Sequence, residues 1–306
     1  MGNSPLVPYL RRLAAERKKL EEIHVERVQR LFRKEIAESK NTVVSENVIN
    51  PVVSNKCYDL VYIVREGERN QDLRMSLRSV EKFCNYRKIW IIGYKPSWIT
   101  GVEYIHTEQK GNKWQNSNNN YLVACNCPDI SEDFILMNDD FFAIKPIINW
   151  KENVNVYLGN IGDEIQKYSK KDSKSRWQYA FDYANDLLDD MKCNTRYNYE
   201  SHWPIMINKK TYLEFINRPE IIEFLKGRKV LHKRSIYRNL YPLENVENQK
   251  LIKDVKIPLN RDLTVDFLQE SWLSVFDDVV DNWRKFPKLN GYLKIMFPNK
   301  SKFEND

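Results

Sequence analysis

The sequence predicts an α/β fold in which helices flank a mostly parallel sheet. Two observations favour this class. Short apolar runs typical of buried strands recur between residues 59 and 137, and segments with helical spacing of apolar residues separate them. The predicted strands are residues 59–64, 88–92, 102–105 and 134–137, and the predicted helices between them are residues 72–84 and 116–125.

Local features justify these elements in order. The first strand is apolar after its first residue, and a polar loop, residues 65–70, follows it. The second strand ends at Gly93, and the last runs directly into Asn138. The helix between the first two strands carries three apolar residues on one face, namely Leu73, Leu77 and Val80.

The segments outside this core are predicted from weaker patterns. Residues 8–40 have apolar positions at three-, four- and seven-residue steps among charges, which predicts one long basic helix that could pair with a second copy of the chain. Residues 41–56 are polar and aperiodic, as in a linker. The second half predicts a helix at 176–191, a loop at 198–204 and short helices at 211–216 and 221–225.

Composition narrows the class of protein. The chain has 306 residues, 42% of them hydrophobic, and a formal net charge of +7, which suits an enzyme that handles phosphates and also suits weak attraction to nucleic acid. Its five Cys have no spacing typical of a zinc site, so reduced thiols and a cytoplasmic location are expected. No nucleotide-binding glycine loop, serine-hydrolase elbow or zinc-protease motif occurs.

The triplet Asn138-Asp139-Asp140 is the strongest candidate site. Carboxylates directly after a buried strand can hold Mg²⁺ or Mn²⁺, and such a metal neutralises a diphosphate leaving group. The triplet is thus a relaxed form of the DxD motif of transferases that use nucleotide-sugars. The alternative interpretation is an ordinary turn or helix cap.

Two further sets of residues could bind phosphate or a metal. Arg74 and Arg78 are four residues apart, so they share a helix face and could clamp a diphosphate, although salt bridges are the alternative. His202 stands in the aromatic, Pro-bounded loop, with Glu200 nearby, and could be a general base or metal ligand. The basic run from Lys226 to Arg238 could bind phosphate or a nucleic-acid backbone, or be a solvated surface.

These clusters are expected to meet in space. Ligands of parallel α/β sheets bind beyond the carboxyl ends of the strands. Residues 65–70, the loop after Ile92 and the triplet beginning at Asn138 each follow a predicted strand. The sequence therefore predicts one site at this edge of the sheet.

Residues 58–146 resemble the Stealth family, which includes capsular polysaccharide phosphotransferases and the catalytic subunit of the lysosomal-enzyme GlcNAc-1-phosphotransferase. The resemblance lies in the order and spacing of six motifs, and the later stretch HWP at 202–204 is similar to the family's H-x-P element. The six motifs are DLVY at 59–62, EG at 66–67, DLRMSLRSVEK at 72–82, RKIWII at 87–92, NS at 116–117 and NDDFF at 138–142.

The resemblance implies a GT-A-like, Rossmann-like fold, a nucleotide-sugar donor of the UDP-sugar type, and Mg²⁺ or Mn²⁺. It implies that Asp59 and Glu66 lie at the donor site and that Asn116 contacts donor or acceptor. It further implies that Arg74 and Arg78 contact the donor phosphates or fix their helix.

The resemblance also implies a catalytic centre. Asn138 would bind the donor, Asp139, Asp140 and His202 would be catalytic, and Asp140 with His202 would hold the metal. The resulting domain division is a basic arm and linker at 1–50 and a transferase domain at 51–306, with its core at 57–210 and a helical extension at 211–306.

The sequence departs from the family pattern at VREG, residues 64–67, where the family has WVDG. With this departure, the chain resembles a compact member of the family, of the kind found among glycosyltransferase-like proteins of bacteriophages. For such proteins a hydroxylated DNA base in the host cytoplasm is an alternative acceptor to a glycan. The bond formed stays open, since the same site chemistry serves transfer of a sugar or of a sugar-1-phosphate. The other functional hypotheses are a nucleic-acid-binding or structural protein on a degenerate transferase fold, and a metal-dependent phosphodiesterase.

Overall fold

The protein is described here from a computed structural model, in which the described residues are 57–171, 173–227, 229–244, 248–254, 256, 270–274 and 293–305. The chain divides into two compact units, and the larger spans residues 55–286 and 299–306. Every element and site discussed below belongs to that larger unit. The predicted helix at 8–40 and linker at 41–56 lie outside the described residues.

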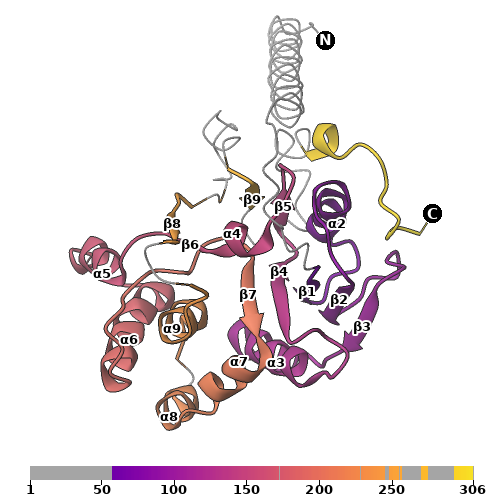
Figure 1. The fold of residues 1–306 in the computed structure, drawn as a ribbon. Coiled ribbons are helices and arrows are strands. Elements are labelled where there is room, and N and C mark those ends of the chain that lie inside the picture. The colour runs from indigo at the N-terminus through magenta and orange to yellow at the C-terminus, as the bar shows by residue number, and fades with distance from the viewer. Residues whose placement is uncertain are drawn as a thin grey trace, which may run out of the picture. The chain divides into compact units, whose positions relative to one another are not determined.

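A five-stranded sheet forms the centre of this unit, in the order β3-β2-β1-β4-β7 (Figure 1). The first four strands are parallel, whereas β7 runs antiparallel to β4. This confirms the predicted α/β class with a mostly parallel sheet. The strands are β1 (Asp59–Val64), β2 (Ile89–Gly93), β3 (Glu103–His106), β4 (Asp133–Asn138) and β7 (Ile205–Asn208).

Helices and two small two-stranded sheets complete the described part. The small sheets pair β5 (Phe141–Ala143) with β9 (Trp272–Ser274), and β6 (Val156–Tyr157) with β8 (Lys250–Leu251). No helix among the described residues has the length and apolar character needed to cross a membrane. The helices are α2 (Gln71–Phe83), α3 (Lys113–Asn126), α4 (Trp150–Val154), α5 (Ile161–Ser169), α6 (Arg176–Asp190), α7 (Lys209–Ile216), α8 (Pro219–Lys226) and α9 (Lys233–Leu240).

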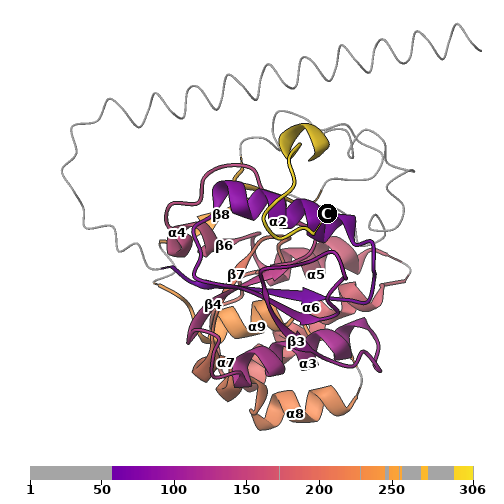
Figure 2. The ribbon, with the colours of Figure 1, turned by 90° about the vertical axis from the view of Figure 1, so that its right-hand side faces the viewer.

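The sheet is covered on both faces, because alternate residues of each strand point to opposite sides. In β1, Leu60 and Tyr62 pack in the apolar layer that includes Leu77 of α2. Val61 packs in the other layer, which includes Tyr121 of α3 and residues of α7 and α9. Figure 2 shows α2 on one side of the sheet and α3 and α7 on the other. Burial on both faces explains why the strands are continuous apolar runs.

Asparagine caps determine where the first two helices begin. The Asn70 side chain accepts a hydrogen bond from the backbone of Leu73 and starts α2. Asn112 and Gln115 form a capping box, so α3 begins at Lys113, earlier than the predicted start at residue 116. The capping residues that set this start are polar, so a search for apolar spacing does not detect them.

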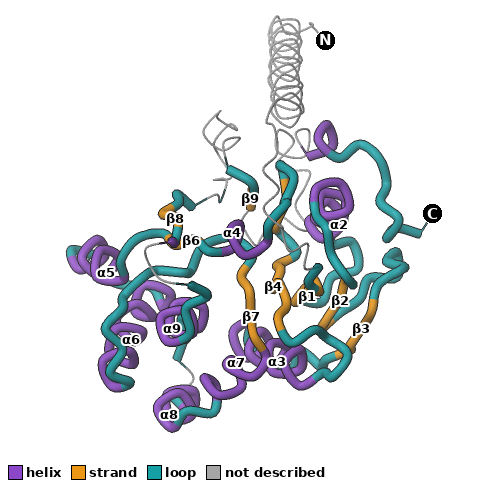
Figure 3. The backbone as a smooth tube through the Cα atoms, viewed as in Figure 1, coloured by secondary structure: helices purple, strands orange, loops and turns teal. Residues whose placement is uncertain are grey.

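The carboxyl ends of the parallel strands form one edge of the sheet, and β7 brings a further segment to it. Because β7 is antiparallel, Ile205 at its start lies opposite Leu136, near the end of β4. The loop at 198–204 therefore reaches the same edge as Asn138. Figure 3 distinguishes the strands from the loops that leave their ends. Gly93 ends β2 with a φ of 114°, and a Cβ there would be 2.1 Å from a backbone oxygen of Val64, so this position requires glycine.

Several elements were not predicted from the sequence, among them β7 and α9. The strand β7 has four residues, too short for a clear pattern, and pairing with β4 determines its conformation. The basic run at 226–238 was interpreted as a surface, but its second half is helix α9, in which most residues are buried. Between residues 257 and 292, the structure describes 270–274, which include β9.

Candidate active site

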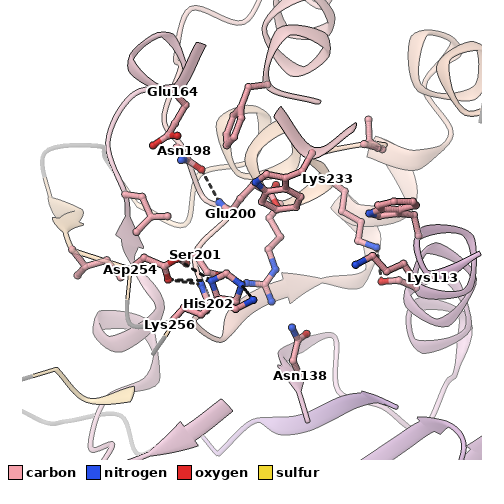
Figure 4. Close-up of a pocket in the computed structure, with 18 of the residues that line it drawn as sticks. Lys113, Asn138, Glu164, Asn198, Glu200, Ser201, His202, Lys233, Asp254 and Lys256 are labelled. Atoms are coloured by element: carbon pink, nitrogen blue, oxygen red, sulfur yellow. Dashed lines mark hydrogen bonds and ion pairs between the residues drawn. The ribbon is translucent and has the colours of Figure 1, made fainter. Parts of the chain in front are cut away.

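A cavity of about 910 Å³ lies at the carboxyl edge of the sheet (Figure 4). This volume is within the range of small-molecule sites. Its lining comes from the start of α3, the end of β4, helices α5 and α6, the loop before β7, the start of α9, and residues 252–254 and 256. Six Lys or Arg side chains line it against three Asp or Glu, so an anionic ligand is favoured.

His202 is held between an acid and a base inside this cavity. Its Nδ1 lies 3.1 Å and 3.0 Å from the two carboxylate oxygens of Asp254, and its Nε2 lies 3.0 Å from the Nζ of Lys256. Because a carboxylate only accepts, Nδ1 carries the hydrogen, and Nε2 accepts from the lysine ammonium. Burial alone would raise the pKa of Asp254, but the hydrogen bonds with His202 outweigh it and lower that pKa, which keeps the acid ionised.

The segment that carries Asp254 and Lys256 is attached beside the turn formed by residues 138–140, which we call the NDD turn. Lys256 forms a backbone bridge to Ser274 of β9, and β9 pairs with β5, directly after the turn. The Ser274 hydroxyl donates a hydrogen bond to Asp140 at 2.8 Å. The position of His202 therefore depends on segments that lie more than fifty residues apart in the sequence.

Arg234 places a buried guanidinium next to the His202 loop. Its Nη1 donates to the backbone oxygens of Ser201 and Trp203, each at 2.8 Å, and so fixes the residues on both sides of His202. The residue is 8% exposed, and its Nη2 has no hydrogen-bond partner among the described residues. A buried donor without an acceptor is costly, so this group is suited to an anionic ligand.

Lys233, the first residue of α9, crosses the cavity to α3. Its amine donates to the Ser117 hydroxyl and the Asn118 side-chain oxygen, each at 2.8 Å, and lies 3.9 Å from the ring centre of Tyr121. Burial lowers the pKa of Lys233 to about 7; Glu200 opposes this change and Arg234 adds to it. A bound anion would favour the charged amine.

Glu200 holds the start of α9 in place. Its carboxylate accepts a hydrogen bond from the backbone of Ser235 at 3.0 Å, which satisfies one of the donors at the helix N-terminus. The cap residue His232 makes no such bond with its own side chain. Glu200 therefore positions both cations, Lys233 and Arg234, at the cavity.

The NDD turn contributes one residue to the cavity lining. Asn138 lines the cavity together with His202, whereas residues 65–70 and the loop after Ile92, the other members of the predicted site, do not line it. Asp139 instead accepts a hydrogen bond from the Asn70 side chain at 3.0 Å, and Asp140 is 4% exposed and bonded to Ser274. These two carboxylates connect the turn to the start of α2 and to β9.

Arg74 and Arg78 do not reach the cavity. Arg74 Nη1 donates to Glu304 at 2.7 Å, and Arg78 donates to both of its oxygens, at 2.6 Å and 2.7 Å. Both guanidiniums therefore form salt bridges, as in the alternative interpretation, and their partner is Glu304. The reason is that residues 299–305 return across the exposed face of α2, which the sequence pattern did not indicate.

Three other predicted donor residues also lie outside the cavity lining. Asp59 begins β1, so it is at the opposite edge of the sheet, where it is buried and paired with Arg87. Glu66 is at the correct edge but exposed, with its backbone bonded to Gln109. The Asn116 side chain accepts a hydrogen bond from the backbone N–H of Gly111 and donates one to the backbone oxygen of Gly111, each at 2.9 Å. Neighbouring residues on α3 line the cavity, but Asn116 does not.

The predicted metal ligands do not form a site for a divalent cation. Nε2 of His202 faces the Lys256 amine, and Asp140 is buried against Ser274. In the part of the chain that the structure describes, no three His, Cys, Asp or Glu side chains gather as metal ligands would. The donor set therefore does not fit Mg²⁺ or Mn²⁺.

Asp254 and Lys256 were not predicted as site residues. They stand in an aperiodic stretch, outside the region that resembles a known family. Residues 251–256, LIKDVK, mix apolar and charged residues without a period, so no pattern there indicated a site. Lys233 and Arg234 were part of the predicted basic run, but not as members of a cavity.

Comparisons with known proteins give similarities to glycosyltransferase structures. No family model matches the sequence, and no curated protein sequence matches it. The galactosyltransferase LgtC, solved with donor and acceptor sugar analogs, is 8% identical over 81% of this chain and 98% of that one, with a TM-score of 0.47. Mouse xyloside xylosyltransferase 1 is 9% identical over 81% and 96%, with a TM-score of 0.36.

The glycosyltransferase GlyE of Streptococcus pneumoniae TIGR4 is 11% identical over 62% of this chain, with a TM-score of 0.34. This chain spans 44% of the GlyE structure, less than half of its length. Similarities at these scores do not identify a function.

Proposed function

We propose that this chain is a transferase that moves a sugar, or a sugar-1-phosphate, from a nucleotide-sugar to a hydroxyl group. The cavity supports the proposal: His202, oriented by Asp254, lies among the side-chain cations Lys233, Arg234 and Lys256. A base beside a cationic pocket is what this reaction needs, because a hydroxyl must lose its proton while a phosphate leaves with negative charge.

The proposed chemistry uses His202 as the base. When the donor enters, Lys256 turns from Nε2 to a phosphate oxygen, and Nε2 takes the proton of the acceptor hydroxyl. In sugar transfer the hydroxyl oxygen bonds to C1, the bond from C1 to oxygen breaks, and a nucleoside diphosphate leaves. In phosphosugar transfer it bonds to the β-phosphorus, the bridging bond from that phosphorus to oxygen breaks, and a nucleoside monophosphate leaves.

Aromatic side chains at the cavity give the acceptor a place to bind. Trp114 and Tyr168 line it, and Trp177, which is 40% exposed, lines it as well. Flat faces of this kind stack on sugars and on nucleobases. A glycan and a hydroxylated DNA base therefore both remain acceptors to be tested, and a UDP-sugar is the first donor to test.

A screen of nucleotide-sugars tests the proposal. We expect at least one donor to raise the melting temperature in proportion to its affinity, and mass spectrometry of the products then identifies the bond that breaks. The proposal fails if no nucleotide-sugar is bound or turned over.

A histidine substitution tests the assigned base. His202→Gln is expected to lower turnover by about 10²-fold or more, with donor binding retained, because it removes the proton acceptor and not the cations. His106→Gln is the matched control, since His106 ends β3 at the same edge of the sheet but is exposed and outside the cavity lining. Equal turnover in the two variants would exclude His202 as the base.

A further inference from the structure

The Lys256 ammonium lies next to Nε2 of His202, where a divalent cation would have to bind this histidine. A metal ion bonded to an imidazole nitrogen stands about 2 Å from it and uses the same lone pair that Lys256 engages at 3.0 Å. The other ring nitrogen is bonded to Asp254. A dication and the Lys256 ammonium would therefore compete for one lone pair and repel each other.

The acidic residues of the NDD turn do not offset this competition. Mg²⁺ and Mn²⁺ prefer several oxygen ligands that converge on one point. Asp139 is bonded to Asn70 at the start of α2, whereas Asp140 is bonded to Ser274 of β9. These two neighbouring carboxylates thus form hydrogen bonds with different elements of the fold and do not act as a pair of metal ligands.

The charge that a metal would supply is already present in side chains. Lys256, Lys233 and Arg234 line one cavity and come from two segments of the chain. Arg234 offers the buried Nη2, and a guanidinium donor of this kind suits a phosphate oxygen. A bound anion favours the charged form of Lys233, and the three cations then balance the two negative charges of a nucleotide-sugar diphosphate.

We propose, on the basis of the proposed function, that Lys256 replaces a divalent cation in this site, and that Lys256, Lys233 and Arg234 bind the diphosphate of the donor without metal. Lys256 then has two alternative partners: His202 before the donor binds and a phosphate oxygen afterwards. The donor is thus the ligand that exposes Nε2 of His202 to the acceptor.

Calorimetric titration of the full chain with UDP tests this, with excess EDTA in one series and Mn²⁺ in the other. We expect UDP to bind in EDTA, with an affinity that Mn²⁺ changes by less than about threefold. Lys256→Met should weaken UDP binding about tenfold or more, because a charged hydrogen bond is lost. Lys210→Met is the control, since Lys210 is exposed at the opposite edge of the sheet, and it should bind like the wild type. Circular dichroism establishes that each variant is folded.

The outcomes separate this proposal from the proposed function. UDP binding or nucleotide-sugar turnover that requires Mn²⁺ overturns the role of Lys256 and leaves the transferase proposal standing. Unchanged UDP binding by a folded Lys256→Met variant overturns it as well. If neither UDP nor any nucleotide-sugar binds in either series, both proposals fail; pyrophosphate titrated in EDTA then shows whether the anion site itself exists.

Discussion

The amine of Lys233 occupies a place that disfavours its charge. It lies between α9 and α3, next to the Arg234 guanidinium, and burial lowers its pKa from 10.5 to about 7. Protonation of this amine favours the unfolded chain, because the unfolded chain binds the proton more tightly. An anion bound in the cavity would restore the charged form.

Lys233→Met is expected to stabilise the protein and to weaken UDP binding. The wild-type penalty is greatest below pH 7, where the amine is charged in both states, and it falls as pH rises from 7 towards 10.5. The stability gain of the variant should therefore be largest below pH 7 and shrink above it. Urea denaturation at several pH values measures this gain. A gain that is independent of pH would show that the wild-type amine does not titrate as proposed.

At the scale of elements, α2 is tied to the end of the chain. Glu304 accepts hydrogen bonds from Arg74 and Arg78 and from the backbone of Ser301, and its side chain is fully buried. Burial alone would raise the pKa of Glu304, but these bonds lower it from 4.5 to about 2. This cluster holds residues 299–305 on α2, the helix whose cap Asn70 also binds Asp139 of the NDD turn.

Glu304→Gln should reduce the free energy of unfolding at pH 7 by about 3 kcal/mol, because two guanidiniums lose their common carboxylate. The lowered pKa of Glu304 means that its contribution is complete above pH 4.5 and is lost as pH falls towards 2. The difference between variant and wild type should thus shrink across that interval in urea titrations. A difference that is constant with pH would exclude the ion pair as its source.

The sequence predicted those elements whose pattern is local. The strands β1, β2 and β4 are continuous apolar runs and α2 has a single apolar face, and the common edge of parallel strands then places Asn138 beside a site. The partners of Asp140, Arg74 and His202 could not be predicted, because Ser274, Glu304 and Asp254 lie 50 to more than 200 residues away in segments without periodicity. Charged side chains indicate that a partner exists, and the fold determines which one.

At the scale of the whole molecule, two electrostatic explanations of donor binding must be separated. The chain carries a net charge of +7, which attracts anions over its entire surface. The cavity has its own excess of cations, six Lys or Arg against three acids. General attraction is screened by salt within about 10 Å at 0.1 M, whereas contacts inside a cavity are screened much less.

The dependence of UDP affinity on salt distinguishes the two. Lys256→Met and Lys210→Met each lower the net charge by one, but only the first lies in the cavity. If the cavity binds the diphosphate, the first variant loses affinity at every salt concentration, and the second matches the wild type once surface attraction is screened. Calorimetric titrations from low to high ionic strength measure this. Equal losses in both variants that disappear at high salt would show that net charge, and not the arrangement around His202, attracts the ligand.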